Sequence, residues 1–180
     1  MNWYKKALEQ ELFRGDPNPI NIEDYDPEYA TRELNKELGA SSAWGPGIYF
    51  VSQKDIAELY GLNITRKVLH DPKILTKQNP LFNYQQIDKM LQSIDKDKVE
   101  TAISNWSEDY KEGKKLLIQS LINADNPLDQ LMNIWADIFY HQNPQAFIDL
   151  MLKNGIDGIS IYKPSDDATY YVIYNKNVLK

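Results

Sequence analysis

WGPGIYFVSQKDIAELYG, residues 44–61, decides the fold because it joins a strand to a helix without a linker. Gly45 and Gly47 permit positive φ and close backbone approach, and Pro46 between them stiffens the turn. The next four residues, IYFV, are β-branched or aromatic, which is typical of a short buried strand. We therefore expect a strand over residues 48–51, with functional side chains at the rim of the strand-turn-helix unit.

The helix after this strand has local start and stop signals. Ser52 is placed to cap its first turn, with Asp55 three residues on in the capping-box position. Gly61 ends the helix. Its apolar face is expected to consist of Ile56, Leu59 and Tyr60. Glycine-rich turns also occur in proteins that bind no ligand, so the pattern alone leaves a binding role open.

Upstream of this unit, a brief strand over 12–15 carries Arg14 and runs into the turn DPNP. Arginine offers five donors in a fixed fork and pairs with a carboxylate or a phosphate. A structural salt bridge is therefore the alternative to a ligand contact for Arg14. Amphipathic helices are expected over 3–12 and 27–38.

Downstream, strands are expected over 63–69 and, after a turn, over 73–75. Helical spacing dominates residues 84–153. The chain then returns to strands over 159–162 and 169–174, which fit a hairpin. Two apolar stripes are expected to be core: Val99, Ile103, Trp106 and Tyr110, and then Leu128, Leu131, Trp135, Ile138 and Phe139.

Composition bounds the class of protein. A chain of 180 residues with 42% hydrophobic content can bury a core, and it suits one domain. No apolar run approaches the roughly 20 residues that span a bilayer, and the N-terminal residues lack a signal-peptide core. Zero cysteines fit a reducing, cytoplasmic compartment and exclude thiolate metal sites and a cysteine nucleophile. We expect no membrane partner.

Other features narrow the ligands. A net charge of −6 disfavours broad attachment to nucleic acid, although a local basic groove stays open. His70 and His141 are far apart in sequence and are expected to be structural, so we expect no metal site. The chain contains no GxGxxG, Walker A, HExxH or GxSxG motif.

Three stretches together resemble the ADP-ribosyltransferase superfamily. GPGIYF at 45–50 is similar to the GxGIYF motif of the branch that includes poly(ADP-ribose) polymerases. LFRG at 12–15 resembles the family's first motif strand, and YYVIY at 170–174 resembles its final EYxVY strand. The chain looks most like small bacterial and phage-type members. This resemblance implies an α+β fold, with a split β-sheet core around an NAD cleft in one domain over 1–180 and a helical insertion over about 84–153.

The resemblance also implies site roles, carried over by position. Gly15 would hold the carboxamide of NAD through its backbone, and Tyr49 and Tyr60 would stack the nicotinamide ring. Two tyrosine faces suit a cationic ring, at about 0.5–2 kcal/mol per contact. Arg14 would contact a ribose or a phosphate, and Ser52 belongs to the NAD-binding set. The catalytic set would be Arg14, Tyr49 and Tyr170.

Two positions depart from the family pattern. Ala57 stands where the polymerase branch has a serine that also binds the carboxamide, and Tyr170 stands where the family has its catalytic glutamate. That glutamate normally stabilises an oxocarbenium-like transition state. Asp166 and Asp167, in the loop before the last strand, either return a carboxylate to the site or serve as turn formers.

The expected function is transfer of one ADP-ribose from NAD to a macromolecular acceptor, with release of nicotinamide. We expect the acceptor to be protein rather than nucleic acid. Two alternatives stay open at the level of sequence: a catalytically silent module that binds NAD or ADP-ribose, favoured by the missing glutamate, and an NAD glycohydrolase toxin that uses water as the acceptor.

Overall fold

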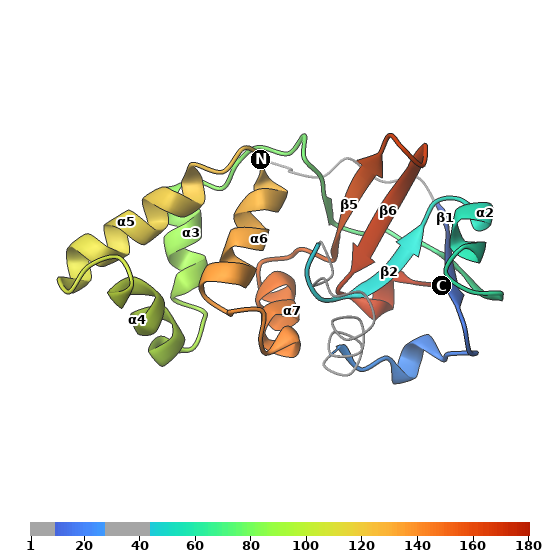
Figure 1. Cartoon of the computed structure of the whole chain (residues 1–180), viewed down its shortest axis with the longest axis horizontal. Coiled ribbons are helices and arrows are strands. Elements are labelled where there is room, and N and C mark those ends of the chain that lie inside the picture. The colour runs from blue at the N-terminus through green and yellow to red at the C-terminus, as the bar shows by residue number, and fades with distance from the viewer. Residues whose placement is uncertain (1–9, 28–43) are drawn as a thin grey trace.

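The computed structural model describes residues 10–27 and 44–180, and it has the α+β architecture expected from the sequence (Figure 1). The strands are β1 (Glu11–Asp16), β2 (Ile48–Val51), β3 (Asn63–Val68), β4 (Ile74–Leu75), β5 (Gly158–Lys163) and β6 (Ala168–Ile173). The α-helices are α2 (Lys54–Glu58), α3 (Tyr84–Leu91), α4 (Lys96–Ser104), α5 (Tyr110–Ile122), α6 (Pro127–Asp137) and α7 (Pro144–Lys153). Short 3-10 helices are η1 (Ile22–Asp24) and η2 (Lys176–Val178).

The strands form one six-stranded mixed sheet in the order β3-β1-β2-β6-β5-β4. Neighbouring strands are antiparallel, except that β4 pairs with β5 in parallel. β1 pairs with β3 along its whole length but meets β2 at one register pair, Phe13 with Val51. The junction between β1 and β2 is thus the narrowest in the sheet, and a true division into two half-sheets stays a prediction of the resemblance.

Alternation along the two central strands gives the sheet two different faces. Ile48, Phe50, Tyr171 and Ile173 pack in a cluster with the C-terminal residues Val178 and Leu179. Tyr49, Val51, Tyr170 and Val172 point the other way, toward clusters that involve the helices. We call the second side the helical face of the sheet.

Helices α3–α7 occupy residues 84–153, where the sequence predicts helical structure. Figure 1 shows them as a group beside the sheet, with α6 and α7 nearest to it. Their largest core cluster also contains Ile159, Ile161 and Val172 from β5 and β6, so these helices and the sheet share apolar packing. Whether the whole of 1–180 is one domain remains a prediction.

Polar side chains cap helices α3–α6 as capping rules expect, whereas Asn143 at the start of α7 makes no side-chain cap bond. Asn83 forms a capping box with Gln86 at α3. Asp95, Asp109 and Asn126 accept hydrogen bonds from first-turn N–H groups of α4, α5 and α6. A longer-range polar contact joins α6 to the segment before α3: buried Gln130 accepts from the Phe82 N–H at 2.7 Å and donates to its carbonyl at 2.9 Å.

Helix α2 lies directly on β1. A Cβ added to Gly15 would lie 1.9 Å from the carbonyl oxygen of Ala57 and 2.6 Å from that of Gly61. Only a residue without a side chain permits this approach. Ala57 is fully buried in a small cluster with Val51 and Tyr170, so α2 covers one end of the helical face.

The predicted cap of α2 is wrong. Gln53 is the N-cap residue and makes no side-chain cap bond, whereas the Ser52 Oγ accepts a hydrogen bond from the Thr169 N–H at 3.0 Å. The predicted apolar face is also wrong beyond Glu58, where the helix ends. Leu59 is 79% exposed and Tyr60 is 57% exposed, because both follow the last helical residue and leave the packed face.

Two other sequence predictions need correction. Trp106 and Tyr110 are exposed rather than core, whereas Val99 and Ile103 of the same stripe are buried. The stripe was counted across the end of α4, where the periodicity no longer applies. Glu11 and Leu12 belong to β1 and not to a helix over 3–12. Gln10 is also not helical, and residues 3–9 of that predicted helix and 28–38 of the next lie outside the described residues.

The second stripe, from Leu128 to Phe139, is buried as predicted. Across residues 10–27 and 44–180, no helix has the length and apolar content needed to cross a membrane.

Candidate functional site

The three strands that carry the sequence motifs are neighbours in the sheet, in the order β1-β2-β6. Val51 lies opposite both Phe13 of β1 and Tyr170 of β6, and Tyr49 lies opposite Val172. Segments from the two ends of the chain are therefore brought together, and Tyr49 and Tyr170 share the helical face.

Tyr49 is half-buried and packs against the helical core cluster. Its hydroxyl donates to the Gly45 carbonyl at 2.6 Å. The Trp44 ring stacks beside it, with ring centroids 6.3 Å apart and an angle of 21° between the planes. An aromatic ring of the protein thus already lies along Tyr49, where the resemblance places nicotinamide.

Trp44 connects two parts of the site. Its ring centroid lies 5.4 Å from that of Tyr170, and the residue packs against both the helical core cluster and the small cluster under α2. Sequence reasoning missed this residue. Its position directly before the turn Gly45-Pro46-Gly47 was the available signal, since the positive φ of Gly45 (78°) permits a sharp change of chain direction there.

Tyr60 lies just beyond α2, and its hydroxyl is 3.4 Å from that of Tyr170. Tyr49 and Tyr60 are therefore linked through Trp44 and Tyr170. We call these four residues the aromatic cluster.

The loop between β5 and β6 places one of its two aspartates on the aromatic cluster. The Tyr170 hydroxyl donates to Asp166 Oδ2 at 2.6 Å. Asp166 also accepts from Lys163 Nζ at 2.9 Å and from Ser165 Oγ at 2.8 Å. Asp167 instead accepts a hydrogen bond from the Tyr162 hydroxyl at 2.7 Å. The carboxylate that bonds to Tyr170 is thus that of Asp166.

These contacts determine the charge states of the pair. The hydrogen bond from Tyr170, followed by those from Lys163 and Ser165, lowers the pKa of Asp166 from 3.8 to about 2. Burial and then the hydrogen bond to Asp166 raise the pKa of Tyr170 above its ordinary value. At neutral pH the pair therefore consists of an ionised carboxylate and a neutral phenol.

Arg14 makes the salt bridge that was the alternative to a ligand contact. Its Nη2 lies 2.8 Å from Asp16 Oδ1, and its Nε donates to both oxygens of the same carboxylate. Nη1 donates to the Tyr49 carbonyl at 3.3 Å and so ties β1 to β2. Asp16 is only 6% exposed, so this ion pair is largely removed from solvent. A contact between Arg14 and NAD stays a prediction.

Gly15 lies in β1, and Ser52 directly follows β2. Gly15 lies beneath α2, against the Ala57 carbonyl. Ser52 continues the junction between β2 and β6, because its N–H donates to the Thr169 carbonyl at 2.9 Å and its hydroxyl accepts from the Thr169 N–H. The contacts of both residues with NAD stay predictions.

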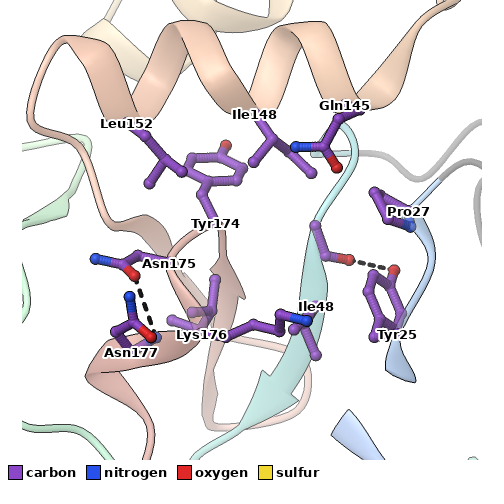
Figure 2. A pocket seen from close by; sticks show the side chains of 12 residues that line it. Tyr25, Pro27, Ile48, Gln145, Ile148, Leu152, Tyr174, Asn175, Lys176 and Asn177 are labelled. Carbon is purple, nitrogen blue, oxygen red and sulfur yellow. Dashed lines mark hydrogen bonds between the residues drawn. The ribbon is translucent and has the colours of Figure 1, made fainter. Parts of the chain in front are cut away.

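A separate pocket of about 250 Å³ opens between α7, the start of β2 and the residues after β6 (Figure 2). None of the predicted site residues lines it. Its walls include four aliphatic side chains, those of Ile48, Ile148, Leu152 and Ile173. Among its polar side chains, Tyr25 donates to the Gly47 carbonyl and Lys176 donates to the Glu23 carbonyl, whereas the buried Tyr174 hydroxyl has no hydrogen-bond partner.

Within the described residues, no group of three or more histidine, aspartate or glutamate side chains is positioned to hold a metal ion.

No protein-family model matches the chain, and no curated protein matches it. In structure the chain is similar to an anti-CRISPR protein, with a TM-score of 0.36 and 15% identity over 93% of this chain and 91% of that one. Similarity at this level bears on neither the detailed fold nor the function of the chain.

Proposed function

We propose that the protein transfers a single ADP-ribose from NAD to a macromolecular acceptor and releases nicotinamide. The observation that carries this proposal is the convergence of the three motif strands, which brings Tyr49 and Tyr170 onto one face of the sheet, with Tyr60 against Tyr170. These residues come from distant parts of the sequence, and the resemblance assigns all three to one NAD site.

The proposed reaction breaks the bond between the ribose C1′ and the nicotinamide nitrogen. The bonding electron pair leaves with nicotinamide, which becomes neutral, and positive charge develops on the ribose. A nucleophile of the acceptor then bonds to C1′ and loses its proton to solvent or to a basic group. The site must therefore hold a flat cationic ring and stabilise a developing positive charge.

The aromatic cluster suits the first requirement. Tyrosine faces attract a cationic ring by stacking and cation–π interaction, each worth about 0.5–2 kcal/mol. Tyr60 is the accessible member of the cluster, since more than half of its surface is exposed beside Tyr170.

The acceptor is proposed to be a protein. The chain carries a net charge of −6, which opposes general attraction to the phosphates of nucleic acid. Lys163 is paired with Asp166, and Arg14 is paired with Asp16, so two of the cations nearest the aromatic cluster are already partly neutralised.

Tyr60→Ala tests the NAD site with little risk to folding, because the side chain is mostly exposed. Loss of one aromatic contact is expected to weaken NAD binding about 2- to 30-fold by calorimetry. Tyr110→Ala is the matched control, since Tyr110 is also exposed but begins α5, outside the sheet. Equal affinity in both variants and the wild type would place NAD elsewhere or nowhere on the protein.

Nicotinamide release distinguishes the competing functions. The proposed transferase releases nicotinamide and leaves ADP-ribose on an acceptor. NAD binding without nicotinamide release identifies a binding module. The observation that favours this alternative is the neutral phenol of Tyr170 where the resemblance expects a glutamate. Release with free ADP-ribose as the sole other product identifies a glycohydrolase.

A further inference from the structure

We propose that Asp166 supplies, through its hydrogen bond with Tyr170, the negative charge that the transfer reaction needs at this end of β6. This inference rests on the proposed function and concerns the same site. It assigns to a loop residue the charge that the resemblance would place at position 170.

The geometry connects the carboxylate to the aromatic cluster in two steps. Asp166 Oδ2 lies 2.6 Å from the Tyr170 hydroxyl, and the Tyr170 hydroxyl lies 3.4 Å from that of Tyr60. Trp44 contacts the Tyr170 ring from another side, at 5.4 Å between centroids. The carboxylate therefore reaches the site through a phenol whose ring is held in the sheet.

The direction of the hydrogen bonds determines what this pair can do. Because the Tyr170 proton is donated to Asp166, the phenol oxygen acts as an acceptor: the Tyr60 hydroxyl, 3.4 Å away, is placed to donate to one lone pair, and the other can accept a further hydrogen bond. A carboxylate acceptor polarises the phenol and makes its oxygen a stronger acceptor. A ribose hydroxyl of NAD that donates to Tyr170 would thus experience the charge of Asp166 without touching it.

Lys163 balances this charge in the resting protein. Its Nζ lies 2.9 Å from Asp166 Oδ2 and 5.8 Å from the centre of the Tyr170 ring. Lys163 is exposed at the end of β5, so solvent screens its attraction to Asp166. Asp166 stays ionised beside Tyr170. The phenol oxygen, polarised by this carboxylate, presents more negative charge to the developing cation.

Asp166 is thus a positioning residue that acts through Tyr170, and its test must separate charge from structure. The readouts are kcat and KM for nicotinamide release from NAD by the full chain, together with the melting temperature. Asp166→Asn is expected to lower kcat about 100-fold and to change KM less than about threefold. Asp166→Glu, which keeps the carboxylate, is expected to restore most of the lost kcat.

Asp167→Asn is the matched control. It removes a neighbouring carboxylate that bonds to Tyr162 instead of Tyr170, and kcat is expected to stay within about threefold of the wild type. Tyr170→Phe keeps the ring but breaks the hydrogen bond to Asp166, and it is expected to lower kcat as Asp166→Asn does.

The strongest test moves the charge from one residue to the other. The double variant Asp166→Asn with Tyr170→Glu places a carboxylate on β6 and removes the one in the loop. It is expected to regain at least about tenfold in kcat over Asp166→Asn alone, because the requirement is for negative charge at this position.

The outcomes separate this inference from the proposed function. If the wild type releases nicotinamide and Asp166→Asn changes kcat by less than about threefold, the inference alone is overturned. Equal losses in Asp166→Asn and Asp166→Glu, matched by equal falls in melting temperature, also overturn it, because they indicate a purely structural role. A wild-type protein that releases no nicotinamide overturns the proposed function and the inference with it.

Discussion

Trp44 occupies a position for which an aromatic ligand would compete. Its ring stacks along Tyr49 and also contacts Tyr170, so a protein side chain already packs against both tyrosine rings. If the nicotinamide ring of NAD binds against Tyr49, part of its binding free energy is used to displace this contact. Aromatic pairs of this kind are worth about 0.5–1.5 kcal/mol beyond their burial.

Trp44→Ala is therefore expected to tighten NAD binding about 2- to 10-fold, because it removes the competing ring. The same change should lower the free energy of unfolding by less than the about 3–5 kcal/mol typical of a fully buried tryptophan, since Trp44 is only partly buried. Calorimetry with NAD and denaturant unfolding measure the two effects.

Trp106→Ala is the control for this prediction, because Trp106 is 43% exposed and lies beyond the end of α4. Its NAD affinity should equal that of the wild type. Weaker NAD binding in Trp44→Ala would instead make Trp44 a wall of the site rather than an occupant.

The pKa of Asp166 predicts a pH dependence of stability. Its pKa is about 2 in the folded protein against an ordinary value of 3.8, so the folded state favours the ionised form. The resulting stabilisation is present above about pH 3.8 and is lost as the pH falls through about 2. The difference in denaturation midpoint between wild type and Asp166→Asn should be constant near neutrality, should fall below about pH 3.8 and should be mostly lost by about pH 2.

Tyr170→Phe provides the internal control, because it removes the largest cause of the low pKa. In that background the stabilisation should be smaller, and its loss should be complete at a higher pH than in the wild type. A difference between wild type and Asp166→Asn that persists unchanged to pH 2 would contradict the assignment of this carboxylate.

Sequence reasoning placed Tyr49, Tyr60 and Tyr170 in one site but did not predict how they meet. The hydrogen bond between Tyr60 and Tyr170 joins residues 110 positions apart. The choice of Asp166 over Asp167 depends on the path of the loop, where Asp167 takes a positive φ of 47°. Such contacts depend on tertiary packing, for which local sequence patterns hold little information.

At the scale of elements, the packing of α2 on β1 brings Tyr60 to Tyr170. Gly15→Ala would push a methyl group into the Ala57 carbonyl, from which an added Cβ would be 1.9 Å away. The helix must move, so we expect a loss of about 1–3 kcal/mol or more in unfolding free energy and weaker NAD binding. Thermal unfolding and calorimetry measure both.

Gly45→Ala is the comparison for stability. A Cβ at Gly45 would first meet the end of the Met132 side chain at 3.2 Å, which can move, so the main cost is the positive φ of 78°, at about 1–2 kcal/mol. A Gly15→Ala variant more stable than Gly45→Ala would show that α2 does not press on β1 as described.

The strands were more predictable than the cap of α2. Residues 48–51, 63–68 and the final hairpin are rich in β-branched and aromatic residues and are bounded by turn formers, and each forms a strand. Ser52 failed as a cap because its hydroxyl bonds to Thr169 across the sheet instead. Local capping patterns compete with such tertiary hydrogen bonds and lose wherever a strand partner lies closer.

At the scale of the molecule, helices α3–α7 share a core with the sheet, and two exposed aromatic side chains, Trp106 and Tyr110, lie where α4 is joined to α5. We expect this region to contribute to acceptor choice rather than to NAD chemistry. Replacing Trp106 and Tyr110 with serine should change which proteins are labelled and leave nicotinamide release in the absence of acceptor unchanged. Parallel losses of labelling and release would indicate a structural role.

The central claim is that one ADP-ribose passes from NAD to a protein. Its most direct test is mass spectrometry of proteins in a bacterial lysate incubated with the purified chain and labelled NAD, with nicotinamide measured in the same sample. The account predicts single ADP-ribose units on protein side chains, in amounts that match the nicotinamide released and that fall about 100-fold with Asp166→Asn. Bound NAD without nicotinamide release, or release without any modified protein, would contradict it.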